Sequence, residues 1–141
     1  MEREIETHKV NGLNEAIDIT VMDEPGHGNA CHVYSIVAID PKHWQDQPDG
    51  TKVLDVEKTA NERHGCVIKF QNGPIGEVGV NGISNEALLA VVRDRLDCFQ
   101  SGKYACEANG VALRHIVNAM ETLHERTRAR MSRGVEGTHT V

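Results

Sequence analysis

The feature that most constrains the fold is a change in hydrophobic period near residue 84. Before that point, apolar residues alternate with polar ones or form short runs of strand-forming residues, as in β-strands. After it, they recur at helical spacing in two stretches separated by a short Ser-Gly-Lys linker, 101–103. Strands followed by helices predict an α+β fold: an amino-terminal antiparallel β-sheet and then a carboxy-terminal antiparallel two-helix hairpin. The 141 residues suit one domain over 1–141, with the sheet over about 17–80 and the hairpin over about 84–133.

The first predicted helix begins after Ser84 or Asn85, either of which can cap its amino terminus. It runs to about Gln100 and carries apolar residues at intervals of three, four and three: Leu89, Val92, Leu96 and Phe99. The second helix begins near Glu107, with an apolar line at intervals of four, three and four: Ala112, Ile116, Ala119 and Leu123. Gly134 is suited to cap its carboxyl end.

Two β-hairpins are predicted in the first part of the chain. Ile17–Met22 alternates apolar and polar residues, and Cys31–Ile39 is rich in strand formers, with a glycine-containing turn between them. Cys66–Gln71 is a further strand, and Ile75–Val80 is expected to return from it beyond an Asn-Gly-Pro turn. A short strand is expected near Lys52–Val56 in the otherwise polar segment 40–63. The polar amino terminus is expected to form a short helix or a loosely held arm.

Composition excludes several classes of protein. The apolar fraction of 39% is enough for a core, which argues against wholesale disorder, and a net charge of −6 argues against a general binder of duplex DNA. No stretch approaches the roughly 20 apolar residues of a membrane span, and no apolar segment follows the charged start of the chain. The four cysteines form no Cys-x-x-Cys pair. We therefore expect a cytosolic protein with reduced thiols and no contact with membranes.

An arginine cluster is the strongest candidate for a binding site. Four arginines and one glutamate fall within His124–Arg133 in an otherwise acidic chain. Arg126, Arg130 and Arg133 are spaced so that a continuing helix places them on one face. Like charges at that spacing repel, and a phosphate would relieve the repulsion because the planar guanidinium binds it with two hydrogen bonds. Alternatively, basic residues near a helix carboxyl end simply complement its dipole and solubilise it.

Phe99 and Asn109 are expected at the linker end of the helical hairpin. Phe99 is the last apolar position of the first helix, and Asn109 lies near the start of the second. Arg126 would lie about 25 Å along the second helix from Asn109 at ~1.5 Å per residue. If the three bind one small ligand, a second subunit has to supply part of the site. The alternative is that Phe99 is a core residue and Asn109 a helix cap.

Other chemistry is poorly supported. The histidines and cysteines of His27–His32 and His64–Cys66 match no zinc-ligand spacing, so buried reduced cysteines and turn histidines explain them better than a metal. The chain contains no nucleophile elbow, no phosphate-binding P-loop and no HExxH motif. We therefore expect a binding protein without catalytic residues, metal or cofactor. A nucleotide phosphodiesterase or hydrolase that uses the histidines, and an arginine-based nucleic-acid or protein interaction module, remain alternatives.

Three runs resemble one family. They are Gln71–Leu89, Asp94–Gly102 and Arg126–Thr138, in that order. Together they are similar to bacteriophage immune-evasion proteins, the Thoeris anti-defence and anti-CBASS nucleotide sponges, which share a helical-hairpin domain. The resemblance covers roughly 65–138, and the turn 23–31 with the strand after it also looks like the longer, Thoeris-type members.

The resemblance implies a function that composition and spacing do not. Such proteins sequester cyclic signalling nucleotides, including glycocyclic ADP-ribose and, in some members, cyclic di- or trinucleotides, in the host cytoplasm and without cleaving them. They assemble as homo-oligomers, often hexamers, with pockets between subunits. The resemblance implies that Phe99 stacks on a base, Asn109 makes a polar contact and Arg126 contacts phosphate. It also implies that Arg130 is the partner arginine of a cyclic-trinucleotide site, with a less specific role for Arg133.

Overall fold

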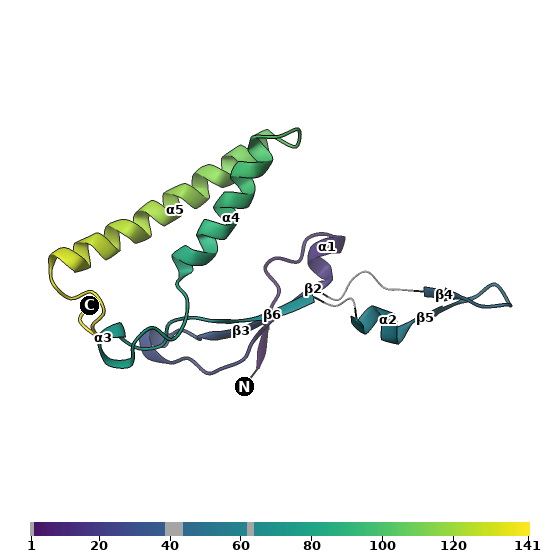
Figure 1. The fold of residues 1–141 in the computed structure, drawn as a ribbon, viewed down its shortest axis with the longest axis horizontal. Helices are drawn as coiled ribbons and strands as arrows, with labels where there is room; N and C mark the ends of the chain where they lie inside the picture. The colour runs from purple at the N-terminus through teal and green to yellow at the C-terminus, as the bar shows by residue number, and fades with distance from the viewer. Residues whose placement is uncertain (1, 39–43, 62–63) are drawn as a thin grey trace. The chain divides into compact units, whose positions relative to one another are not determined.

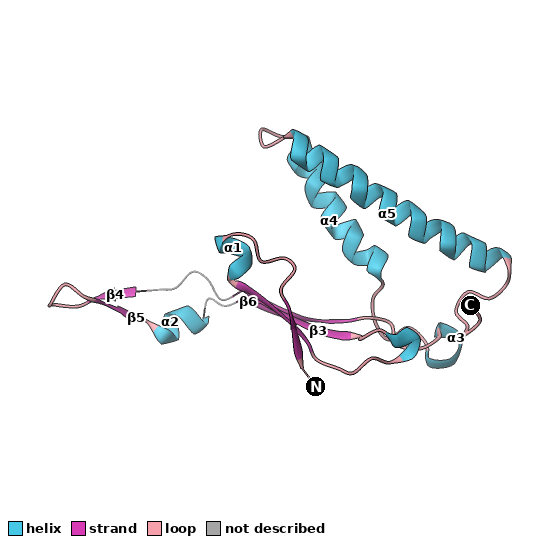
Figure 2. Ribbon diagram, turned by 180° about the vertical axis from the view of Figure 1, so that it is seen from behind, coloured by secondary structure: helices cyan, strands magenta, loops and turns pink. Residues whose placement is uncertain are grey.

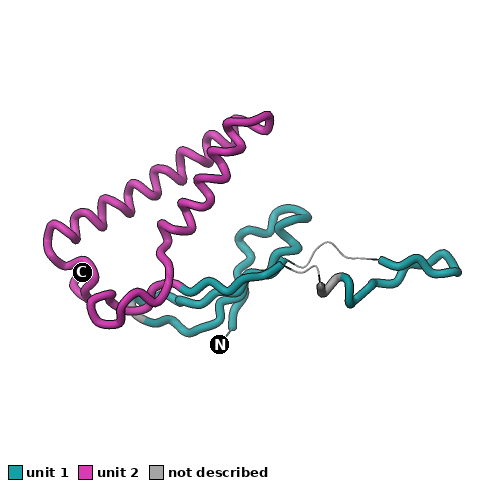
Figure 3. Tube along the Cα trace, viewed as in Figure 1, with its two compact units in different colours: residues 1–69 teal, residues 70–141 magenta. Residues whose placement is uncertain are grey.

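The computed structural model describes residues 2–38, 44–61 and 64–141. The chain divides into two compact units, Met1–Lys69 (unit 1) and Phe70–Val141 (unit 2), coloured separately in Figure 3. Unit 1 carries the sheet and unit 2 carries the helical hairpin (Figure 1). The predicted α+β class, with an antiparallel sheet before a helical hairpin, is confirmed.

Unit 1 is built on a four-stranded antiparallel sheet in the order β1-β2-β3-β6. Its strands are β1 (Arg3–Ile5), β2 (Ile17–Val21), β3 (Val33–Ala38) and β6 (His64–Lys69). The predicted pairing across the glycine turn is confirmed, because β2 pairs with β3 from Ile17↔Ala38 to Val21↔Tyr34. The predicted strand 31–39 extends at its last residue outside the described part of the chain. Val21 is fully buried, so the core of this unit lies against β2.

The turn between β2 and β3 is held by one carboxylate. Asp23 accepts hydrogen bonds from the backbone N–H groups of His32 and Val33, at 2.9–3.0 Å. The hydrogen bond from Val33 is the largest cause of the lowered pKa of Asp23. Between these residues lies the single turn η1 (His27–Asn29), with Gly28 at φ +75°. Glycine suits this position because it adopts positive φ without steric cost.

Four short elements, α1, β4, β5 and α2, complete the described part of unit 1. The amino terminus forms both β1 and a four-residue helix, α1 (Gly12–Glu15), capped by the Asn11 side chain. The predicted strand near Lys52 is confirmed as β5 (Lys52–Leu54), which pairs with β4 (Trp44–Asp46). The helix α2 (Val56–Asn61) follows and was not predicted.

The predicted returning strand Ile75–Val80 is wrong. Residues Ile75–Val78 form one helical turn, α3, which begins after Pro74 and ends at Gly79, φ +72°. The Pro74 carbonyl accepts the backbone N–H groups of Glu77 and Val78 at 3.0 Å, so these groups are satisfied locally and need no neighbouring strand. The short β-like contact made after β6 is instead a parallel bridge between Phe70 and Ile83.

The helical hairpin of unit 2 matches its predicted bounds. Helix α4 (Asn85–Gln100) is capped by Ser84, whose Oγ accepts the Ala87 N–H at 3.1 Å. Helix α5 (Glu107–Ser132) runs antiparallel beside it, as Figures 1 and 2 show. Met120 is the buried apolar residue at their contact. Among the described residues, no helix has the length and apolar character needed to cross a bilayer.

Gly134 ends α5 as predicted. Its φ is +71°, and its N–H donates to the Met131 carbonyl at 3.0 Å, while the Val135 N–H donates to the Arg130 carbonyl at 3.1 Å. These two bonds form a Schellman motif, which satisfies the last carbonyls of the helix. The chain therefore leaves α5 in a defined direction and starts an ordered tail.

Candidate ligand-binding site on the helical hairpin

Phe99 lies in the last turn of α4 and is 40% exposed. The Arg95 guanidinium carbon sits 5.6 Å from the centre of its ring, a cation–π distance. The alternative interpretation of Phe99 as a core residue does not fit this exposure. An exposed ring beside a guanidinium can stack on the flat face of a nucleobase.

Asn109 lies in the first turn of α5 and is half-buried. Its backbone N–H is accepted by the Cys106 Sγ at 3.4 Å, so Cys106 is the helix cap and Asn109 is not. Within the described chain, no residue hydrogen-bonds to the Asn109 side chain. Its amide, which offers both donors and an acceptor, is therefore open to a ligand.

The linker between the two helices is fixed by Gln100. Its side chain accepts the Cys106 N–H and donates to the Cys106 carbonyl, both at 2.9 Å. These two bonds close the linker over Ser101–Ala105 and hold the end of α4 beside the start of α5. The structure thus brings Phe99 and Asn109 to the same end of the hairpin, as predicted.

Arg126 lies seventeen residues beyond Asn109 in the same uninterrupted helix. That interval corresponds to about 25 Å along the axis, so Arg126 lies far from the linker end. Its side chain is exposed and forms no hydrogen bond or ion pair within the described chain. The structure therefore separates Arg126 from Phe99 and Asn109 within one subunit.

Arg130 has a structural role that the sequence did not reveal. It is 8% exposed, and its guanidinium contacts Glu136 at 3.0 Å and the carbonyl oxygens of Val135, Thr138 and Thr140. A guanidinium has five N–H donors, and these contacts use all three of its nitrogens. The predicted trinucleotide contact of Arg130 stays a prediction, and it would require the tail to move.

The tail after Gly134 is packed against α3. The Gly137 carbonyl accepts the Gly76 N–H at 3.4 Å, and a Cβ at Gly137 would meet Ile75 at 2.8 Å. His139 contacts Glu77 at 3.1 Å. We call residues 134–141, held by Arg130 and seated on α3, the carboxy-terminal clasp. Arg133 joins it through a 2.6 Å hydrogen bond to a backbone oxygen of Val141, so two of the three predicted arginines contact protein.

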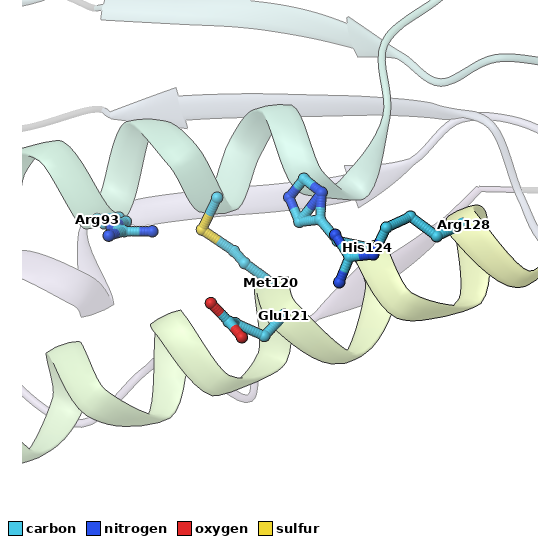
Figure 4. A pocket seen from close by; sticks show the side chains of 5 residues that line it. All are labelled: Arg93, Met120, Glu121, His124 and Arg128. Atoms are coloured by element: carbon cyan, nitrogen blue, oxygen red, sulfur yellow. The ribbon is translucent and has the colours of Figure 1, made fainter.

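A hollow of about 240 Å³ lies between α4 and α5, and neither Phe99 nor Asn109 lines it. Its lining residues come from both helices, as Figure 4 shows: Arg93, Met120, Glu121, His124 and Arg128. These five residues were not predicted from the sequence as one group. The spacing of Glu121, His124 and Arg128, three and then four residues, could have indicated a shared helix face, but only the fold brings Arg93 to it.

The cysteines and histidines of the described residues form no metal centre. Across the described residues, no group of three or more His, Cys, Asp or Glu is placed to hold a metal. All four cysteines are free thiols, and Cys66, Cys98 and Cys106 are exposed. The expectation that the cysteines are buried is wrong for these three, because Cys66 lies on β6 and the other two lie at the linker end of the hairpin.

The chain is similar to known proteins over most of its length. The family model described as the Acb2/Tad1 hairpin domain matches residues 62–128. The protein "Thoeris anti-defense 1" of Bacillus phage SBSphiJ7 is 44% identical over 112 residues, which cover 70% of this chain and 79% of that protein. The chain belongs to the Thoeris anti-defense 1 family. As a Thoeris anti-defense 1 relative, it has an anti-defence role. The hairpin match contains Phe99, Asn109 and Arg126 and stops before Arg130 and the clasp.

Proposed function

We propose that this Thoeris anti-defense 1 family member is a sponge for cyclic nucleotide immune signals. It binds glycocyclic ADP-ribose, or cyclic di- or trinucleotides, in the host cytoplasm and holds them without cleaving them. The signal then never reaches the effector of the bacterial defence system. The observation that carries this proposal is the pairing of a 40% exposed Phe99 with the unused Asn109 amide at one end of the hairpin.

The ligand site is completed by a second subunit. Phe99 and Asn109 supply a stacking surface and a polar contact, and Arg126 supplies a charge about 25 Å away along α5. A neighbouring hairpin in a homo-oligomer, a hexamer in this proposal, brings its own Arg126 to the linker end of the first. Charge-assisted hydrogen bonds from that arginine to phosphate are about twice as strong as neutral ones. Arg133 lies seven residues beyond Arg126, about 10 Å further along the helix axis, and it can approach the ligand only once its hydrogen bond to Val141 is released.

Binding and the fate of the ligand are measured together. Calorimetry with glycocyclic ADP-ribose and a cyclic trinucleotide gives the affinity, and light scattering gives the mass of the assembly in solution. The protein is then heated, and mass spectrometry identifies the released ligand. Recovery of the intact cyclic nucleotide supports the sponge. Recovery of a linear product points to a hydrolase instead, and salt-dependent binding of RNA or DNA with no preference for cyclic nucleotides points to a nucleic-acid module.

Two variants test the residues. Phe99→Ala removes one stacking contact, and we expect it to weaken binding by about 1–3 kcal/mol. Trp44→Ala, which removes an exposed aromatic side chain from β4 in unit 1, is the matched control and leaves the affinity unchanged. Equal losses in both variants would show that the Phe99 ring does not contact the ligand.

A mixing experiment tests the shared site. Phe99→Ala and Arg126→Ala subunits are each expected to bind poorly. If each site takes Phe99 from one subunit and Arg126 from another, co-assembly of equal amounts restores about a quarter of the sites. No recovery in verified mixed assemblies would place all contacts within one subunit.

A further inference from the structure

The hollow between α4 and α5 is lined by an unusual set of side chains for an acidic protein. It contains two guanidinium groups, one imidazole and one carboxylate above the buried thioether of Met120. In Figure 4, the Arg128 side chain extends back along α5 toward His124, and His124 and Met120 project toward α4. Arg93 faces the same hollow from α4.

These basic groups are not committed to protein partners. Within the described chain, Arg128 and His124 form no hydrogen bond or ion pair. Arg93 has one contact, to Asp97 at 3.9 Å, and both side chains are well exposed. Exposed ion pairs of this kind contribute little, so an incoming anion can replace Asp97 at small cost.

We propose that this hollow is a second anion site, which binds the phosphate group of a small sugar phosphate. Arg93 and Arg128 donate guanidinium N–H groups to the phosphate oxygens, and His124 donates one imidazole N–H. Arginine suits this task because its planar fork matches the phosphate geometry. The sulfur and carbon atoms of Met120 lie under the sugar carbons.

Glu121 makes the site selective for a sugar phosphate. A carboxylate repels a bare anion but accepts a hydrogen bond from a hydroxyl group. The hollow, about 240 Å³, is also smaller than the roughly 300–1,000 Å³ of sites for drug-sized ligands. Glu121 therefore disfavours inorganic phosphate, and the small volume disfavours a whole dinucleotide. A phosphorylated pentose suits the hollow better than either.

This site is separate from the proposed cyclic-nucleotide site. Arg126 and Arg128 are two residues apart, and at about 100° per residue their side chains leave α5 on opposite sides. Phe99 and Asn109 are not among the residues that line the hollow. The two sites can therefore be tested independently with the same protein.

The test is calorimetric titration of the full chain with ribose 5-phosphate and with inorganic phosphate. We expect saturable binding with a preference for ribose 5-phosphate. Arg128→Gln and Arg93→Gln each weaken it about tenfold or more, the effect of one lost charge-assisted hydrogen bond. Arg3→Gln, which removes an exposed arginine from β1, and Arg126→Gln leave it unchanged.

Glu121→Gln gives a second readout that a general loss of charge would not produce. It removes the repulsion of inorganic phosphate, so the preference for ribose 5-phosphate over phosphate falls. An unchanged preference in this variant overturns the sugar assignment.

Absence of saturable binding, or an equal loss in Arg3→Gln, overturns the site itself. A loss in Arg126→Gln equal to that in Arg128→Gln places the anion in the cyclic-nucleotide site and also overturns it. Circular dichroism confirms that each variant retains its helices.

Discussion

Replacing Arg130 with alanine tests the carboxy-terminal clasp. The guanidinium holds Glu136 and three backbone carbonyls, four hydrogen bonds in all. Loss of the side chain should release the tail from α3 while leaving the helical hairpin folded. The variant also separates the structural contribution of Arg130 from its predicted contact with a trinucleotide.

The loss of stability expected for Arg130→Ala depends on how exposed Glu136 and the three carbonyl groups become to water. Breaking a buried ion pair by removing one member costs about 3–5 kcal/mol when the other charge stays buried. Here the Glu136 side chain is 41% exposed, so it regains water once Arg130 is gone. The carbonyls lie in a short tail that can also move into solvent. We therefore expect a loss of about 2–3 kcal/mol in the free energy of unfolding, which corresponds to one or two charge-assisted hydrogen bonds.

Urea unfolding at one fixed protein concentration measures this loss, because assembly would otherwise change the apparent stability. Hydrogen exchange reports the tail directly, and the N–H groups of Val135 and Thr138 should exchange faster in the variant. Arg114→Ala is the matched control. It removes an exposed arginine from the same helix, where no hydrogen bond or ion pair within the described chain would be lost.

One result would refute the reasoning about the clasp. If Arg130→Ala and Arg114→Ala have the same stability and the same tail exchange, the contacts of Arg130 do not hold the tail. A second variant localises the effect. Glu136→Gln keeps the three carbonyl contacts, so it should cost less than Arg130→Ala and leave most of the tail protected.

Three further predictions concern stability. Ser84→Ala removes the cap that accepts the Ala87 N–H and should cost about 1 kcal/mol in urea unfolding. Gly134→Ala places a side chain at φ +71° and should cost about 1 kcal/mol, whereas a loss near zero would mean that α5 ends differently. The backbone hydrogen bond from Val33 lowers the pKa of Asp23, so its contribution to stability is present above the ordinary carboxyl pKa and lost as pH falls through the lowered one. Stability measured against pH in Asp23→Asn should therefore lack part of this acid loss, and identical profiles would contradict the assignment.

Local signals were sufficient where the structure depends on neighbouring residues. A cap at Ser84 or Asn85, the end of α4 near Gln100 and the glycine at 134 were all predicted, because each depends on a few adjacent positions, and the structure shows that Ser84 is the cap. The predicted strand Ile75–Val80 is wrong because two neighbouring residues outweighed its apolar pattern. Its apolar residues suit a strand, but Pro74 and Gly79 close a helical turn that satisfies the backbone locally.

The candidate site shows the same division. Sequence spacing placed Phe99 and Asn109 at one end of the hairpin and Arg126 far from them, because a continuous helix fixes the distance. It could not distinguish Arg126 from Arg130, since both satisfy the same spacing on the same helix.

The sequence by itself determined the change from strands to a two-helix hairpin, its bounds and the arginine-rich end of α5. Only the tertiary structure decided which of those arginines contact other parts of the protein and which stay exposed. Arg130 is buried because the tail folds back onto it, while Arg126 stays exposed. Likewise, Arg93 joins His124 and Arg128 only because α4 packs antiparallel on α5. Helical period depends on residues three or four positions apart, whereas the partner of a charged side chain depends on segments that folding brings together.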